Sequence, residues 1–355
     1  MQKILRIYKL QFVRLCDIIT NSKKRIQKQR LVIMDFKEYL RAARLDPEIG
    51  DRAEYMTMGD KMLSNVFVNG QRNSPSVCAT YDADVTKFAE AFDKLRAECD
   101  YKLTLNSVML KVLTEALKAA PRLNAHFKYD HAKTAGQYII KKHIDVSMAV
   151  CKEDGRTFQM KLLHLEDKSL KEIAVMAADA RVRLDTADLE EVMFEASRQH
   201  IIGELSKGKI LAPMRQALSA SFGKGKVVRL SETLKSDFLK LTGKKELQPA
   251  SGIKIEEINE GTVCFTNWGA ICDSPNFNIV SGPLLYPQVF LFSMGRLREE
   301  KYVYEDEKGN IRLGTKKVLP LGLNFDHKIG GAYELTPFIK KLEEIFENPD
   351  VMFSW

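Results

Sequence analysis

The sequence lacks several features that would assign a 355-residue chain to a class directly. Its six cysteines include no C-x-x-C pair, which argues against a disulfide framework and against a cysteine-based zinc site. No run of about 18 apolar residues is present, so no transmembrane helix is expected. The motifs G-x-G-x-x-G, Walker A, H-E-x-x-H and G-x-S-x-G are also missing. We therefore expect a cytoplasmic protein with reduced thiols, whose function must be inferred from less common patterns.

Net charge is also missing from most of the chain. The sequence has 55 Lys and Arg against 47 Asp and Glu, a formal net charge of +8. Residues 1–33 hold nine of the basic residues and a single acidic residue, so this segment accounts for the whole excess. Residues 34–355 carry no net charge that would attract polyanions, and nucleic acid is therefore not expected as a partner.

The basic segment 1–33 has neither the uninterrupted apolar stretch nor the small-residue cleavage site of a secretory signal. It is predicted to be a loosely ordered extension, because chain ends are usually mobile unless they are tied down. An alternative stays open, since a mixture of basic and apolar side chains is also typical of a helix that lies on a membrane surface.

Helical and strand patterns are mixed along residues 34–355 without a strict strand–helix–strand repeat. Alternating or continuous apolar runs predict strands at 76–85, 138–150, 157–165, 261–270, 287–297 and 317–327, with a hairpin at 301–313. Helical periodicity predicts helices at 34–50, 86–98, 104–120, 167–184 and 334–348. Residues 184–260 are richer in charge and are predicted to be mostly helical. This mixture favours an α+β fold with a mixed sheet.

The histidines offer one candidate for chemistry. Five of them have no neighbour at metal-ligand spacing, so we predict structural or surface roles for them and no metal site: His126, His131, His143, His164 and His200. His327 differs because it ends an apolar run and precedes Gly330 and Gly331, where the backbone can approach a ligand closely. An imidazole in such a place can serve as a general base, since its ordinary pKa lies near neutral pH.

The segment "FDHKIGGA" around His327 resembles the D-H-R-x-x-D-G-A signature of the acyltransferase catalytic domain of 2-oxo acid dehydrogenase complexes. That domain is the dihydrolipoyl acyltransferase core, which shares the fold of chloramphenicol acetyltransferase. Further stretches resemble the family's motifs in the same order: "ADVTKF", "APRLNAHF", "DKSLKEIA", "GTVCFTNWGA", "PQVFLFSMGRL" and "LEEIFENPDVMF". The resemblance covers roughly residues 55–183 and 260–353.

The resemblance implies an α+β, chloramphenicol acetyltransferase-like fold, with a mixed β-sheet flanked by helices. Residues 34–355 would form the acyltransferase-like catalytic domain, and residues 184–260 would be a mostly helical insertion into it. Family members move an acyl group between coenzyme A and a thiol, so acyl-CoA is the implied co-substrate and no metal is implied. The motifs do not identify the residues that would bind coenzyme A.

Two catalytic residues follow from the matched positions. His327 would be the base that deprotonates the attacking group. Thr266 stands at the family's Ser/Thr position in "GTVCFTNWGA", and its hydroxyl would stabilise the oxyanion by a hydrogen bond. Because the family works as a trimer, the resemblance implies that the two residues come from different chains and meet in a channel between subunits.

The chain departs from the family pattern after His327. The stretch "HKIGGA" is one residue shorter than the family's loop, and Gly330 or Gly331 stands where the motif has Asp. The family's arginine in the preceding helix is replaced by Asp60. The joint absence fits the loss of one ion pair, because a buried charge without its partner would cost about 3–5 kcal/mol.

Two functions therefore stay open at the level of sequence. One is a CoA-dependent acyltransferase that acts on a small thiol, amine or hydroxyl acceptor. The other is a catalytically inactive family member that binds a ligand or serves as an assembly subunit. No lipoyl domain, Pro/Ala-rich linker or peripheral-subunit-binding domain is recognised, so we expect a stand-alone homotrimer or higher oligomer. Whether Cys264 or Cys272 lines the channel also stays open, although both are predicted to be small core residues.

Overall fold

The computed structural model describes residues 58–130, 133–151, 157–187, 261–271 and 282–355, with isolated positions at 52, 192, 253 and 255–258. The expectations for residues 1–33, for a helix at 34–50 and for most of the 184–260 insertion lie outside these residues. The chain divides into two compact units, Met1–Tyr55 and Met56–Trp355, and every described helix and strand belongs to the second unit. The domain boundaries stay a prediction.

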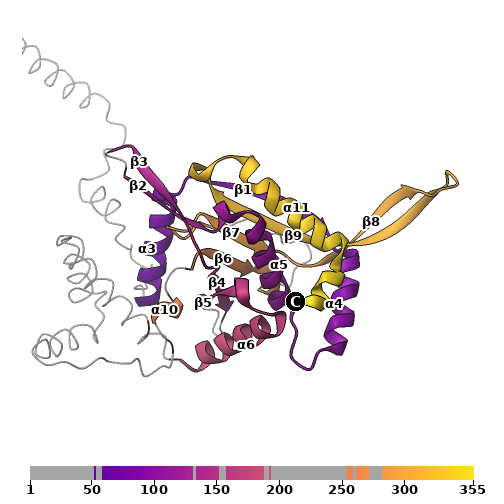
Figure 1. Cartoon of the computed structure of the whole chain (residues 1–355), viewed down its shortest axis with the longest axis horizontal. Coiled ribbons are helices and arrows are strands. Elements are labelled where there is room, and N and C mark those ends of the chain that lie inside the picture. Colours follow the sequence, from indigo (N-terminus) through magenta and orange to yellow (C-terminus); the bar gives the residue numbers. More distant parts are fainter. Residues whose placement is uncertain are drawn as a thin grey trace, which may run out of the picture. The chain divides into compact units, whose positions relative to one another are not determined.

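The second unit is built on a seven-stranded mixed sheet, which confirms the predicted fold class (Figure 1). Its strand order is β1-β9-β7-β6-β4-β5, and β8 pairs with the outer part of β9. The strands are β1 (Ser76–Asp84), β4 (Val146–Cys151), β5 (Thr157–Leu162), β6 (Val263–Asn267), β7 (Phe290–Met294), β8 (Arg298–Glu305) and β9 (Ile311–Asp326). The β4–β6 and β6–β7 pairs run parallel, and the other pairs of this sheet are antiparallel.

Helices cover both faces of the sheet. They are α3 (Met58–Asn73), α4 (Thr86–Glu98), α5 (Leu105–Ala119), α6 (Leu170–Thr186), α10 (Ile255–Ile258) and α11 (Thr336–Glu347). The larger core includes Phe265 of β6 and Phe292 of β7, and the Phe292 ring packs edge-on against Phe338 of α11. The preceding residues on these strands, Cys264 and Leu291, point the other way and join a smaller apolar cluster with Val66 and Phe67 of α3. Among the described helices, none is both long and apolar enough to cross a membrane.

The helix starts were well encoded in the sequence. Thr104 caps α5 by accepting a hydrogen bond from the backbone N–H of Ser107, and the Ser107 hydroxyl oxygen accepts one from the N–H of Thr104. Ser169 and Glu172 form the same reciprocal pair at the start of α6. Such pairs satisfy backbone donors that a helix leaves without partners at its first turn. α5 and α6 begin one and three residues after the start of their predicted ranges, whereas helical periodicity did not predict α3.

The cap of α6 supports a stability prediction. Ser169→Ala is expected to lower the free energy of unfolding by about 1 kcal/mol, because the N–H of Glu172 loses its acceptor. Equilibrium unfolding in urea would measure the difference. Ser169→Asp retains a side-chain acceptor and should stay close to the wild type. An equal loss in both variants would contradict the assignment of the effect to the cap.

One of the predicted strands is wrong, because the structure does not form it as one continuous strand. Residues 138–150 read as one strand in the sequence, but the structure divides them between β3 (Ala135–Ile140) and β4. β3 pairs with β2 (Ala125–Asp130) in a separate two-stranded sheet. The buried Asn124 side chain donates hydrogen bonds to the carbonyls of Lys141 and His143, with Nδ2–O distances of 3.2 and 3.0 Å. This side chain satisfies backbone acceptors that a continuous strand would have paired with a neighbouring strand.

The β8–β9 hairpin projects beyond the rest of the sheet, as Figure 1 shows. Its turn lies where the sequence predicts it, with Gly309 at a φ of 78° and the Asp306 carboxylate accepting from the N–H groups of Lys308 and Asn310. The outer half of β9 is largely exposed, and the inner half is buried between β1 and β7. β9 thus leads from a projecting hairpin through the middle of the sheet to His327.

Candidate active site

His327 lies directly after the last residue of β9, at the start of the short 3-10 helix His327–Ile329. The Asp326 carboxylate caps this turn by accepting from the N–H of Lys328 at 2.9 Å. The His327 N–H donates to the carbonyl of Pro75 at 2.8 Å, which ties the turn to the chain just before β1. The imidazole itself is exposed and has no hydrogen-bond partner among the described residues, with the Phe325 ring centroid 6.2 Å away. A fixed backbone therefore carries a ring that is free to accept a proton.

A buried ion pair holds the residues on either side of His327. Asp326 is 1% exposed, and its Oδ2 lies 2.6 Å from Lys328 Nζ. The same ammonium group also donates to the carbonyl of Asn73, and the Tyr138 hydroxyl donates to the carbonyl of Lys328. A carboxylate this deeply buried needs such a partner to stay charged. Asp326 and Lys328 thus position the histidine that they flank.

The structure shows why the two glycines after His327 are not equivalent. Gly330 has a φ of 141°, which side chains rarely adopt, and a Cβ there would lie 2.7 Å from Cγ of Glu334. A Cβ on Gly331 would have no neighbour within 4 Å. An aspartate is therefore incompatible with the conformation at 330, whereas 331 is spatially open and simply lacks a side chain.

A second ion pair, which the sequence did not reveal, ties the loop 327–335 to the segment before β2. Arg122 Nη1 donates to Glu334 Oε1 at 2.5 Å, and the Arg122 guanidinium also lies over the Tyr138 ring at 5.4 Å from its centroid. The two charged residues stand 212 positions apart, so no local pattern could have paired them. The loop that lacks the family's aspartate is thus held by a different acid–arginine contact.

Thr266 lies near the end of β6, where it pairs in parallel register with Ser293 of β7. Phe265 points into the larger core, so Thr266 and Cys264 face the α3 side of the sheet. The end of β6 is fixed by Asn267, whose Oδ1 accepts from the N–H of Ala270 at 3.1 Å and whose Nδ2 donates to Asn106 Oδ1 at 2.6 Å. Thr266 is buried, and its hydroxyl has no hydrogen-bond partner in the described part of the chain.

One chain does not bring Thr266 and His327 together. Thr266 of β6 pairs with Ser293 of β7, and Ser293 pairs with Gly322 of β9. His327 follows Gly322 by five residues. With neighbouring strands about 4.8 Å apart and a rise of about 3.3 Å per residue, the two residues are separated by about 20 Å. A hydroxyl and a base at this distance cannot act on the same carbonyl group.

A hollow of about 260 Å³ lies between α3, β1 and the loop before β7, and its wall includes Asn324, which precedes His327 by three residues. It is lined by Gly70, Gln71, Ser74, Ser76, Cys78, Gly282, Pro283, Leu284 and Asn324. Two buried polar atoms at its wall, Ser74 Oγ and Asn324 Oδ1, have no hydrogen-bond partner among the described residues. Buried polar groups are costly without partners, so a ligand with hydrogen-bonding groups would be stabilised here.

The sequence left open whether Cys264 or Cys272 lines the channel between subunits. The structure describes Cys264, whereas Cys272 lies outside the described residues. Burial raises the pKa of the Cys264 thiol to about 12, so the thiol stays protonated at neutral pH. The side chain packs in the smaller apolar cluster with Leu284, Leu285 and Leu291. A protonated thiol in apolar surroundings is a packing residue and not a nucleophile.

This assignment predicts selective protection of Cys264. Iodoacetamide at mildly alkaline pH should leave Cys264 unmodified in the folded protein and should modify it after denaturation in guanidinium, because the thiolate is the reacting form. Peptide mapping by mass spectrometry would quantify the modification, and the denatured sample shows that the peptide is detectable. Rapid labelling of the folded protein would instead place this thiol in an accessible channel.

Comparison with known proteins agrees with this architecture. The family described as 2-oxoacid dehydrogenases acyltransferase (catalytic domain) matches residues 50–200 and 240–354. The chain belongs to this family. The predicted acyltransferase class is therefore confirmed at the level of the family, although none of the curated proteins matches the chain.

Solved structures of acyltransferase cores share the fold at low sequence identity. A probable dihydrolipoamide acetyltransferase from Listeria monocytogenes 4b F2365 superposes with a TM-score of 0.54 at 15% identity, over 85% of this chain and 96% of its own. The cubic core of the pyruvate dehydrogenase multienzyme complex gives a TM-score of 0.53 at 16% identity, over 91% and 98%. A dihydrolipoamide acetyltransferase from Azotobacter vinelandii gives the same four values. These similarities confirm the predicted chloramphenicol acetyltransferase-like α+β fold.

Proposed function

We propose that this protein is a CoA-dependent acyltransferase in which His327 is the general base and Thr266 stabilises the oxyanion. The observation that carries the proposal is the state of His327. Its imidazole is exposed and free of hydrogen bonds to described residues, while its backbone is fixed by Pro75 and by the flanking Asp326–Lys328 pair. A base that must accept a proton from a substrate needs this combination of a free ring and a fixed position.

The reaction follows from these two groups. A ring nitrogen of His327 removes the proton from the acceptor's thiol, amine or hydroxyl as that group attacks the thioester carbonyl of acyl-CoA. The Thr266 hydroxyl donates a hydrogen bond to the oxyanion of the tetrahedral intermediate. Collapse of the intermediate breaks the carbon–sulfur bond, and the imidazolium returns its proton to the departing CoA sulfur. The products are the acylated acceptor and free CoA, and His327 is again neutral.

The proposal includes assembly into a homotrimer or higher oligomer. Thr266 and His327 of one chain are about 20 Å apart by strand register, so a working site requires Thr266 from one subunit and His327 from the next. The related pyruvate dehydrogenase core is a cubic assembly, which supports an oligomeric arrangement. The hollow lined by Ser74 and Asn324 would then receive part of the substrate close to His327.

The acceptor in this proposal is a small diffusible compound. Both the exposure of His327 and the hollow of about 260 Å³ lined by Asn324 suit a small group that carries a thiol, amine or hydroxyl. The hollow's two unpartnered polar atoms, a hydroxyl on Ser74 and a carbonyl on Asn324, favour an acceptor with additional hydrogen-bonding groups.

A second candidate function is a catalytically inactive member that binds a ligand or serves in assembly. The loop after His327 favours this alternative, because neither Gly330 nor Gly331 supplies a polar side chain. Work on the Azotobacter vinelandii enzyme investigated the role of a serine, a histidine and an asparagine in its catalytic mechanism.

A product screen would distinguish the two functions. The purified oligomer would be incubated with acetyl-, propionyl- and longer acyl-CoA and with a pool of thiol, amine and hydroxyl compounds. Mass spectrometry would then follow free CoA and acylated products. We expect an acylated acceptor to form with release of CoA in equal amount. A folded trimer that turns over none of these acyl-CoA compounds would favour the inactive alternative.

A further inference from the structure

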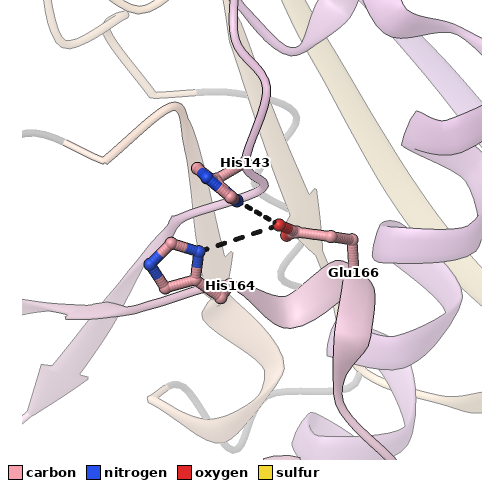
Figure 2. A group of neighbouring side chains, drawn as sticks. All are labelled: His143, His164 and Glu166. Carbon is pink, nitrogen blue, oxygen red and sulfur yellow. Dashed lines mark hydrogen bonds and ion pairs between the residues drawn. The ribbon is translucent and has the colours of Figure 1, made fainter.

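Three potential metal ligands converge at the β4–β5 side of the sheet, on segments that the proposed reaction does not use (Figure 2). His143 lies in the turn before β4, and His164 and Glu166 follow β5. One donor atom from each side chain lies within 4.8 Å of the other two. No second group of three such residues occurs in the part of the chain that the structure describes.

The donor spacing is close to what a tetrahedral ion requires. The His143 Nδ1–Glu166 Oε1 distance is 2.6 Å, and the His164 Nδ1–Glu166 Oε1 distance is 3.8 Å. Zinc bonds of about 2.0–2.2 Å in tetrahedral geometry place neighbouring donors about 3.3 Å apart. These two distances must therefore change by about 0.7 and 0.5 Å, and the two imidazole nitrogens, which lie within 4.8 Å of each other, must approach the same spacing for all three donors to contact one ion. We propose that His143, His164 and Glu166 form a binding site for a divalent transition-metal ion such as Zn²⁺.

The Glu166 carboxylate is oriented for this role. Its Oε2 accepts a hydrogen bond from the backbone N–H of Ile144 at 2.8 Å, which leaves Oε1 directed at the two imidazoles. Ligands of metal sites are usually held in this way by hydrogen bonds from groups that do not touch the ion. At 16% exposure Glu166 is the most buried of the three side chains, so it forms the floor of the site.

The backbone around the two histidines is also constrained. His164 has φ 57° and ψ 45°, a left-handed conformation that costs a residue other than glycine about 1 kcal/mol or more. Its N–H donates to Asp145 Oδ1 at 2.9 Å, and the His143 carbonyl accepts from Asn124 Nδ2 at 3.0 Å. This unfavourable conformation brings the His164 ring next to Glu166. A turn with only a structural role would not require the two side chains to meet.

The donor set selects the class of ion. Two imidazole nitrogens and one carboxylate oxygen suit zinc and its neighbours among the transition metals, whereas Mg²⁺ and Ca²⁺ prefer oxygen ligands alone. The side chains of His143 and His164 are 38% and 48% exposed, so solvent or a fourth donor can complete the coordination. An ion on His143 Nδ1 takes the place of the proton that lies between this nitrogen and Glu166 Oε1, and a neutral imidazole then carries its proton on Nε2.

The effect of the ion would be structural. It would fasten the turn before β4 to the short helix Leu165–Asp167, which follows β5. The same turn is bonded to β6, because the carbonyl of Asp145 accepts from the N–H of Thr262 at 2.6 Å. Thr266 lies four residues after Thr262, which is about 13 Å at the usual rise per residue of a strand. The ion would therefore stabilise the turn without touching the acyl-transfer residues, and its test does not depend on catalysis.

Isothermal titration calorimetry with ZnCl₂ on chelator-treated full-length protein tests the site. We expect one Zn²⁺ per chain, a rise in the midpoint of thermal unfolding on adding Zn²⁺, and visible d–d absorption when Co²⁺ replaces it. His143→Gln should weaken binding at least about 10-fold, since neutral amides are poor ligands for this class of ion. His327→Gln removes an exposed histidine elsewhere in the chain and should leave the stoichiometry unchanged.

His164→Asn keeps the test decisive if other variants fold poorly. Asparagine adopts the left-handed conformation more readily than other residues with a side chain, so this variant should fold as stably as the metal-free wild type. It should also lose the thermal shift with Zn²⁺ and the Co²⁺ absorption. Absence of Zn²⁺ binding by the wild type, or equal binding by His164→Asn, would overturn the proposal and leave His143–Glu166 as a simple hydrogen-bonded pair.

Discussion

His327→Ala is expected to lower the rate of acyl transfer by about 100- to 10,000-fold, the usual contribution of a positioned general base. The variant loses the group that takes the acceptor's proton, while the main-chain bond from residue 327 to the carbonyl of Pro75 is retained. The exposed ring contributes little packing, so the fold should be preserved. Release of CoA in the presence of the acceptor identified by the product screen measures the rate.

A second variant separates a lost base from a displaced loop. Lys328→Met provides the comparison, because it removes the ammonium partner of Asp326 but leaves the imidazole in place. That variant should lose less rate than His327→Ala, because the general base is still present. Wild-type turnover by His327→Ala would show that the base lies elsewhere.

Mixing two inactive variants is expected to restore activity. If each site combines His327 of one chain with Thr266 of the next, a trimer of His327→Ala and Thr266→Val chains contains intact sites wherever the two chain types adjoin in the correct order. Every trimer that contains both chain types has both native residues in one of its three sites, which is about a third of the sites. Isolated mixed trimers should therefore recover about a third of wild-type activity, although Thr266→Val alone should be slower by about 100- to 1,000-fold.

The mixing experiment is performed by co-expression with two different affinity tags, and mixed oligomers are isolated through both tags. Each variant alone, carried through the same purification, gives the background rate. Recovery well above both backgrounds would establish that the catalytic residues come from different chains. A mixture no faster than its components would place Thr266 and His327 in separate roles, since the strand register keeps them about 20 Å apart within one chain.

Much of the fold was predictable because its signals are local. The start of α5 at Thr104, the turn at Gly309 and the buried strand before His327 each depend on a few consecutive residues. The split of residues 138–150 was missed for the opposite reason. Its cause is the side chain of Asn124, which lies at least fourteen residues before that segment and reaches it only in the folded protein.

The candidate site divides in the same way. The sequence by itself determined that His327 ends a strand and that Thr266 supplies a hydroxyl near the end of another, because residue type and hydrophobic pattern are properties of neighbouring positions. Only the tertiary structure decided that Arg122 holds Glu334 and that His143 meets His164 at Glu166. These contacts join segments that the strand order brings together, and pairing between distant strands depends on the energy of the whole packed core, which no local pattern encodes.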